Sequence, residues 1–150
     1  MLTRVFEPPD AAAVSEVIRR AMRVTNSKDC PPAILEPLIE YFSPEKVSML
    51  AKERLCLVAE LGERIVGTIA LADGALHTFF VHPDFQGKGV GTALIKAIED
   101  IAVKNKIEII SLASSLSAVS FYERMGYRKN GFDIEERAGK QIGMEKKVAS

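Results

Sequence analysis

The chain has 150 residues, of which 47% are apolar and 27% charged, and its 20 basic and 20 acidic side chains cancel at pH 7. This composition predicts one globular domain over residues 1–150, and it gives no basic excess for binding nucleic acid or an anionic membrane surface. The N-terminus lacks an apolar signal core and no apolar run is long enough to span a bilayer, so we expect a cytoplasmic protein.

The N-terminal third is predicted to contain one strand and three helical segments. Residues 3–6 favour a strand, and Asp10 is a candidate N-cap for a helix. Its apolar residues recur at helical spacing: Val14, Val17, Ile18, Ala21 and Met22. After a loop at 26–32, further helices are expected at 33–42 and 44–53.

The rest of the chain alternates between strands and helices. Three antiparallel strands are predicted at 54–61, 64–72 and 75–81, with turns at Gly62-Glu63 and Asp73-Gly74. The remaining predicted elements are a helix at 91–104, a strand at 107–112, a helix at 117–125, and strands at 127–136 and 141–148. The strand–helix–strand crossover implies that strands 75–81 and 107–112 run parallel, so the fold class is mixed α/β.

A glycine-rich segment joins strand 75–81 to helix 91–104. It reads Gln86, Gly87, Lys88, Gly89, Val90, Gly91, Thr92. Backbone N–H groups at a helix start lack partners, and glycines let a ligand approach them, so this segment predicts an anion site. The spacing fits neither the dinucleotide fingerprint nor the P-loop.

The pattern Gln86-x-x-Gly89-x-Gly91 resembles the signature of the GCN5-related N-acetyltransferase (GNAT) superfamily. Two further segments support the resemblance: Val81-x-Pro83-x-Phe85 before the loop, and Ala118-x-x-Phe121-Tyr122-x-x-x-Gly126-Tyr127 after it. The resemblance covers nearly the whole chain. It implies a mixed central sheet of about six to seven strands with helices on both faces. It also implies transfer of an acetyl group from acetyl-CoA to a primary amine.

The resemblance assigns roles to particular residues. The backbone of residues 86–92 would bind the pyrophosphate of acetyl-CoA, with Lys88 and the Thr92 hydroxyl as helpers. The edge formed by Phe79, Phe80 and Val81 would pair with the pantetheine arm and polarise the thioester carbonyl. Tyr122 would protonate the departing sulfur, and Phe121 would lie beside the cofactor. Ser117 is the candidate for a further cofactor contact, with Ser114 and Ser115 as rivals.

The general base is not fixed by the family pattern. His77 is the candidate we favour because it lies on the strand of the predicted oxyanion edge and imidazole titrates near neutrality. Glu60, Asp73 and Glu40 are rivals, and a chain of water molecules needs no dedicated side chain.

We expect no metal site, because His77 and His82 are an odd number of residues apart on a strand and no metal-binding spacing of Cys or His occurs. Cys30 and Cys56 are assigned no function.

The acceptor and the assembly remain open at this point. Glu36, Glu40 and Tyr41 could attract an ammonium group, whereas Arg137, Lys140 and Lys146 could attract an acidic acceptor. A non-catalytic acyl-CoA-binding or regulatory module on the same fold is the main alternative to an enzyme. An unrelated nucleotide-binding domain and transfer to an alcohol are weaker ones. The resemblance also implies a homodimer as one expected assembly.

Overall fold

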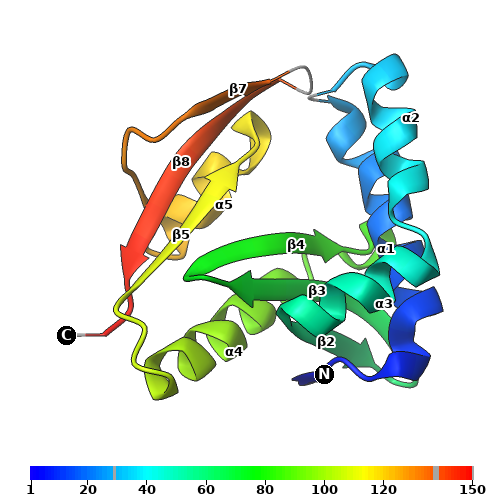
Figure 1. Ribbon diagram of the computed structural model, residues 1–150, viewed down its shortest axis with the longest axis horizontal. Coiled ribbons are helices and arrows are strands. Elements are labelled where there is room, and N and C mark those ends of the chain that lie inside the picture. The colour runs from blue at the N-terminus through cyan, green and yellow to red at the C-terminus, as the bar shows by residue number, and fades with distance from the viewer. Residues whose placement is uncertain (29, 137–138, 150) are drawn as a thin grey trace.

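The computed structural model describes residues 1–28, 30–136 and 139–149. In this part of the chain eight strands form one sheet in the order β1-β2-β3-β4-β5-β8-β6, with β7 paired to β8 (Figure 1). Helices cover both faces of the sheet. The mixed α/β prediction is therefore confirmed, although the sheet has one or two strands more than expected.

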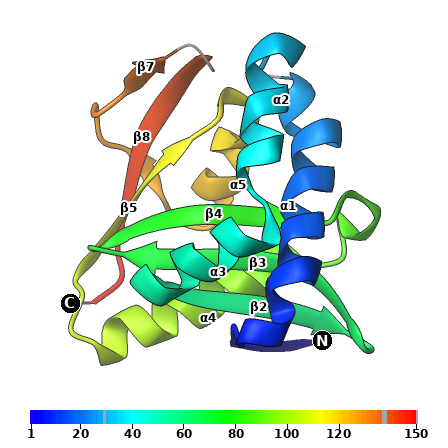
Figure 2. The ribbon, with the colours of Figure 1, turned by 45° about the vertical axis from the view of Figure 1, so that its right-hand side comes forward.

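The N-terminal half of the sheet is antiparallel. β1 (Leu2–Val5) pairs with β2 (Leu55–Leu61), which continues through β3 (Arg64–Ala72) to β4 (Ala75–Val81). Between β1 and β2 the chain forms η1 (Pro8–Asp10), α1 (Ala11–Val24), η2 (Asn26–Lys28), α2 (Pro32–Tyr41) and α3 (Pro44–Glu53). Figure 2 shows α1 and α3 in front of β2, β3 and β4.

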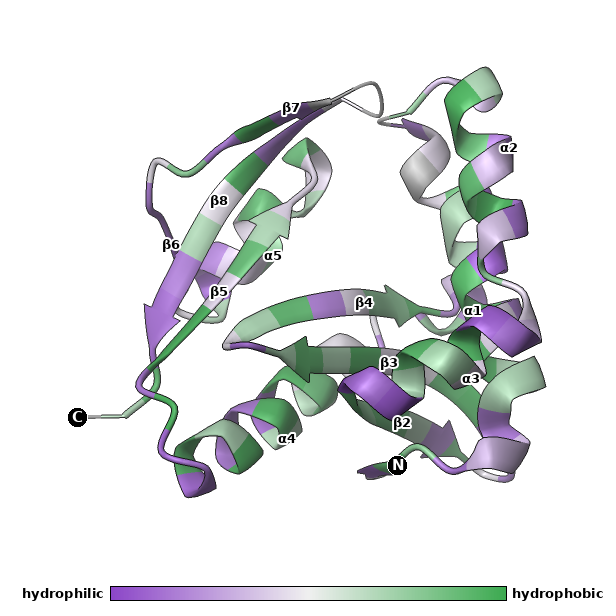
Figure 3. Ribbon diagram, in the orientation of Figure 1, coloured by the Kyte–Doolittle hydropathy of each residue, from purple (hydrophilic) through white to green (hydrophobic). Residues whose placement is uncertain are grey.

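The central strands are buried on both faces, which explains their nearly continuous apolar sequence. On β2, Leu57 and Ala59 belong to the core that includes α4 (Val90–Lys104), whereas Val58 belongs to the core that includes α1. This alternation follows from the two-residue period of a strand. The predicted apolar stripe of α1 is buried as expected. Figure 3 shows β3 coloured as hydrophobic along most of its visible length.

The C-terminal half contains β5 (Ile109–Ser114), η4 (Leu116–Ala118), α5 (Val119–Arg124), β6 (Arg128–Lys129), β7 (Ile134–Glu136) and β8 (Gly139–Lys147). β5 is parallel to β4, as predicted, and antiparallel to β8. The polar group Tyr127, Glu99 and Lys146 links α4 to this half. Glu99 Oε2 accepts from the Tyr127 hydroxyl at 2.9 Å, and Lys146 Nζ donates to Glu99 Oε1 at 3.1 Å.

The prediction of one strand over residues 127–136 is wrong, because β6 and β7 are separated by residues 130–133. Side chains there bond to the backbone in place of regular strand pairing. Asn130 Oδ1 accepts from Phe132 N–H at 3.0 Å, and Asp133 Oδ1 accepts from Gly143 N–H at 3.0 Å. Asn and Asp commonly compete with strand pairing in this way.

Candidate functional site

β4 and β5 diverge and leave a cleft between them. Ala75 pairs with Ser111, and Ser111 N–H donates to Gly74 O at 2.9 Å. Beyond this point the two strands separate (Figure 1), and the cleft has a volume of about 610 Å³. Its walls come from β4, β5, the start of α4, α5 and the C-terminal end of α1. The edge of β4 that faces the cleft therefore carries backbone groups that strand pairing does not use.

The glycine-rich segment forms one end of the cleft. Gly89 is the N-cap of α4 with φ +81°, and Gly87 has φ +75°, a conformation that glycine adopts at little cost. The first hydrogen bond into α4 runs from Ala93 N–H to Gly89 O at 3.0 Å. The N–H groups of the three residues before Ala93 consequently have no partner within the helix, and with the helix dipole they favour an anion.

Most of the predicted phosphate-binding residues line the cleft. They are Gln86, Gly87, Gly89, Val90, Gly91 and Thr92. Lys88 is exposed and does not line it. The structure therefore brings the backbone of the predicted residues together at the cleft, whereas the side chain of Lys88 lies in solvent.

A β-bulge reshapes β4 beside the cleft. Thr78 and Phe79 together oppose Ile69 of β3, because the register shifts by one residue between the flanking pairs. Thr78 has φ +42°, which is rare for a β-branched residue. A bulge bends its strand and redirects the side chains next to it. It lies where β4 turns away from β5.

The predicted oxyanion edge also faces the cleft, which Phe79, Phe80 and Val81 all line. His82 N–H donates to Val66 O of β3 at 2.8 Å. Since successive N–H groups of a strand point to opposite edges, the N–H of Val81 points away from β3 and toward the cleft.

Tyr122 lies on α5, is 8% exposed and lines the cleft. Its ring packs against Phe79 and Phe121, with centroid distances of 6.1 and 5.4 Å. Burial raises the pKa of the Tyr122 phenol above its ordinary value, so the hydroxyl stays protonated at neutral pH. A buried proton donor therefore stands next to the strand edge. Phe121 also lines the cleft.

The serines after β5 enter the cleft together. Ser114, Ser115 and Ser117 all line it. Ser114 is 1% exposed, and its Oγ donates to Ser115 O at 2.7 Å, so its hydroxyl proton is committed to the backbone.

The structure does not bring His77 into the cleft. Leu76 and Thr78 on either side line it, whereas His77 does not, and its side chain is hydrogen-bonded to the backbone of Ala72. Burial, followed by the charge of Arg54, lowers the pKa of His77. The physical reason for the placement is the alternation of side chains along β4. The prediction of His77 as general base is not supported by this position.

The rival bases also lie elsewhere. Glu60 accepts from Arg4 Nε at 2.9 Å, Asp73 is in the β3–β4 turn, and Glu40 is exposed on α2. Within the described ranges, the cleft lining includes neither a carboxylate nor an imidazole.

Sequence reasoning missed several residues of the cleft, namely Ala21, Thr25, Arg124 and Gln141. Ala21 was predicted only as core, and Thr25 directly follows the last turn of α1. Arg124 is exposed and lies two residues after Tyr122, so its position in the second motif was the available signal. It adds a positive charge to the lining.

The candidate acceptor residues are spread over the surface. Glu36, Glu40 and Tyr41 are exposed on α2. Lys140 pairs with Asp133 at 3.8 Å, and Lys146 is bound to Glu99. Arg137 lies outside the described residues.

The described residues contain no group of three His, Cys, Asp or Glu side chains placed to hold a metal ion. Both Cys30 and Cys56 are free thiols. Among the helices of the described ranges, none combines the length and the apolar character that crossing a bilayer requires.

The sequence matches the family model described as "Acetyltransferase (GNAT) domain" over residues 26–148. An uncharacterized N-acetyltransferase of Methanocaldococcus jannaschii is 30% identical over 136 residues, which cover 85% of this chain and 78% of that protein. A second uncharacterized N-acetyltransferase of that organism is 39% identical over 57 residues, only 25% of its length.

Solved structures share the fold. A GCN5-related N-acetyltransferase from Rhodopseudomonas palustris, whose description continues "Aminotransferase, Class-II", aligns with a TM-score of 0.88 and 24% identity, covering 97% of this chain and 94% of that one. The PaiA N-acetyltransferase from Thermoplasma acidophilum, solved in complex with coenzyme A, aligns with a TM-score of 0.80 and 20% identity, covering 98% and 99%.

Proposed function

Because the chain belongs to the GNAT acetyltransferase family, we propose that it transfers the acetyl group of acetyl-CoA to a primary amine by direct attack within a ternary complex. The observation that carries the proposal is the cleft between β4 and β5, which has the free N–H groups of the α4 start at one end and a buried phenol beside its strand edge. The coenzyme A complex of the PaiA N-acetyltransferase supports the choice of cofactor.

We assign the pyrophosphate of acetyl-CoA to the N–H groups at the start of α4, from Gly87 to Thr92. The pantetheine amides then extend along β4 and pair with its unpaired edge, as an added strand would. This places the thioester near Phe79 and Val81. A backbone N–H of this edge donates to the thioester oxygen and stabilises the negative charge that develops on it.

The chemistry requires two proton movements. The acceptor ammonium loses a proton, and the free amine attacks the thioester carbonyl to give a tetrahedral intermediate. The carbon–sulfur bond then breaks, the sulfur takes a proton from Tyr122, and the nitrogen gives up its second proton, which restores the phenol. The products are the N-acetyl amine, CoA thiol and one released proton. Since the described lining has no carboxylate or imidazole, we assign removal of the first proton to water.

The proposal is tested first by binding. The melting temperature of the purified protein is measured with acetyl-CoA, CoA, ATP and NAD, because a ligand that binds only the native state raises it. We expect a rise with acetyl-CoA and CoA and none with the other two. A rise with ATP or NAD alone would assign the cleft to another nucleotide.

Turnover is tested next by following thiol release from acetyl-CoA with a panel of amines and matched alcohols. Release that depends on an amine supports N-acetyl transfer. Tight CoA binding without release by any acceptor would instead favour the non-catalytic acyl-CoA-binding module.

A further inference from the structure

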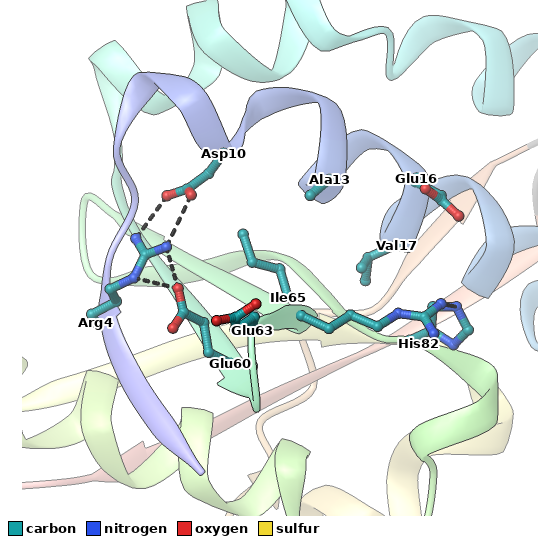
Figure 4. A pocket seen from close by; sticks show the side chains of 10 residues that line it. Arg4, Asp10, Ala13, Glu16, Val17, Glu60, Glu63, Ile65 and His82 are labelled. Atoms are coloured by element: carbon teal, nitrogen blue, oxygen red, sulfur yellow. Dashed lines mark hydrogen bonds and ion pairs between the residues drawn. The ribbon is translucent and has the colours of Figure 1, made fainter.

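A second pocket, of about 300 Å³, lies between α1 and the β2–β3 hairpin (Figure 4). The cluster of Arg4, Asp10 and Glu60 lies at one end of it, and the ring of His82 lies at the other. His82 is 1% exposed, and the proposed mechanism does not use it. It directly follows β4, between the strand edge and the glycine-rich segment.

His82 is the N-cap of the short helix η3 (Pro83–Phe85). Its backbone N–H donates to Val66 O at 2.8 Å, which anchors it to β3. Its carbonyl accepts from Phe85 N–H at 2.9 Å, and its ring Nδ1 accepts from Asp84 N–H at 3.1 Å. The histidine therefore fixes the turn through which the chain enters the phosphate-binding segment.

The contacts continue into the cofactor cleft. The rings of His82 and Phe85 pack edge to face at 5.4 Å, and the Arg64 guanidinium lies 5.3 Å from the centroid of the Phe85 ring. Phe85 and Gln86 both line the cleft. A displacement of His82 would therefore be transmitted to the cleft through one layer of side chains.

We propose that His82, in its neutral form, is a positioning residue for the CoA phosphate site, and that its protonation lowers the affinity for CoA. The inference rests on the proposed function, because it takes the segment of residues 86–92 as that site.

The two ring nitrogens explain why the charge state matters. Nδ1 faces Asp84 N–H, and Nε2 lies 3.1 Å from Arg64 Nη2, so both face N–H donors. Neutral imidazole has one nitrogen lone pair and accepts one of these hydrogen bonds, whereas imidazolium accepts neither. Protonation would also place a positive charge next to the Arg64 guanidinium.

Charged groups approach His82 from three elements. Arg64 comes from β3, Asp84 from η3, and Glu16 and Arg20 from α1. Burial and then the Arg64 charge lower the pKa of His82, while Asp84 and Glu16 oppose the shift. His82 is therefore neutral at physiological pH, and it takes up a proton only as the pH falls through this lowered value. The affinity for CoA should therefore decrease as the pH falls.

The test compares CoA dissociation constants of the wild type, His82→Asn and His77→Asn by calorimetry. Asparagine places an acceptor oxygen near the position of Nδ1 but does not titrate. His77, the other histidine of the chain, lies outside the cleft and is the matched control. We expect the ratio of wild-type to His82→Asn constants to rise about 5- to 10-fold between about pH 8 and about pH 5. His77→Asn should follow the wild type.

CoA itself titrates in this range, because its phosphate monoester has a second pKa of about 6. This effect is common to both proteins and cancels in the ratio of their dissociation constants. An identical pH profile for the wild type and His82→Asn would overturn the proposal. If His82→Asn does not fold, the pKa of His82 is measured in the wild type by nitrogen NMR, with and without CoA. Because the coupling between protonation and CoA binding is reciprocal, CoA must then lower the pKa of His82 further. A pKa unchanged by CoA would also overturn it.

Gly91→Asp separates this inference from the proposed function. If that variant binds CoA like the wild type at every pH, the assignment of the phosphate site is wrong. If it loses CoA binding while His82→Asn keeps the wild-type pH profile, only the role of His82 is wrong.

Discussion

Gly67 of β3 lies directly against Val90, the first residue of α4. A Cβ on residue 67 would approach Val90 Cγ1 at 2.8 Å and Leu94 Cδ1 at 2.9 Å. Gly67 is also the register partner of Val81 on the cleft edge of β4. The absence of a side chain at this position lets the start of α4 pack close to the sheet, and so places its free N–H groups next to the end of β4.

Replacing Gly67 should therefore affect both stability and cofactor binding. Gly67→Ala crowds the side chains of Val90 and Leu94 at the start of α4, and overpacking of this kind costs about 1–3 kcal/mol. We expect that loss in urea unfolding, together with a higher CoA dissociation constant. Gly143→Ala is the matched control, because its Cβ would also clash, 2.4 Å from Phe132 O, but away from α4. Equal effects of both variants on CoA binding would contradict the role given to Gly67.

A carboxylate at the start of α4 should abolish CoA binding. Gly89→Asp and Gly91→Asp each place a negative charge where the proposed site binds phosphate. Gly89 also has a positive φ, so Gly62→Asp, with φ +67° in the β2–β3 turn and open space around its Cβ, controls for backbone strain. Calorimetry should detect no binding by the first two variants and wild-type affinity for the third. If Gly89→Asp and Gly91→Asp still bind CoA, the assignment of the phosphate site is wrong.

Loss of the Tyr122 hydroxyl should slow the reaction without weakening CoA binding. Tyr122→Phe keeps the ring contacts with Phe79 and Phe121. General acid catalysis typically contributes about 100-fold or more, so kcat should fall by about that factor. The CoA dissociation constant should change less than about twofold, well under the 1.4 kcal/mol that a tenfold change represents. An unchanged kcat for an acceptor that is limited by chemistry would rule out Tyr122 as the acid.

Asp10 should make stability depend on acid pH. Its carboxylate accepts from Arg4 Nη1 and Nη2 at 2.8 and 2.9 Å, and these bonds hold its pKa below the ordinary value. A lowered folded-state pKa adds stability above the unfolded-state value of about 3.9, and that contribution disappears as the pH falls through the folded-state pKa. Asp10→Asn should lose about 1.5–3 kcal/mol at neutral pH, the range for hydrogen bonds to charged groups.

The difference between Asp10→Asn and the wild type should shrink as the pH falls below about 4, as measured by urea unfolding across the acid range. Asp100→Asn, at an exposed position of α4, should stay within about 0.5 kcal/mol of the wild type throughout. If Asp10→Asn lowers the free energy of unfolding by the same amount at every pH, the effect of Asp10 comes from packing.

The elements that sequence predicts well are those whose signal is local. The stripe from Val14 to Met22 and the three-strand meander follow from periodicity and turn residues, and the parallel arrangement of β4 and β5 follows from the crossover between them. The interruption at residues 130–133 does carry a local signal, because Asn130-Gly131 is a turn dipeptide and Asn130 Oδ1 accepts from the nearby Phe132 N–H. The bond from Gly143 N–H to Asp133 Oδ1 joins two separate segments and leaves no such pattern.

The same contrast between local and distant signals applies to the candidate site. The glycines of the α4 start and Tyr122 belong to motifs, and the structure brings them to one cleft. His77 lies outside the cleft because side chains alternate along β4 and the bulge at Thr78 shifts that alternation, and the composition of the strand predicts neither. Thr25 and Gln141 enter the cleft from distant segments and carry no motif at all.

The divergence of β4 and β5 also bears on solubility. A strand edge without a partner ordinarily invites another chain to pair with it, which is how many proteins begin to aggregate. Here the unpaired edge lines a cleft whose other walls include β5, α5 and α1, so these elements flank the edge. The fold can therefore keep unpaired backbone groups available for a ligand while neighbouring elements flank them.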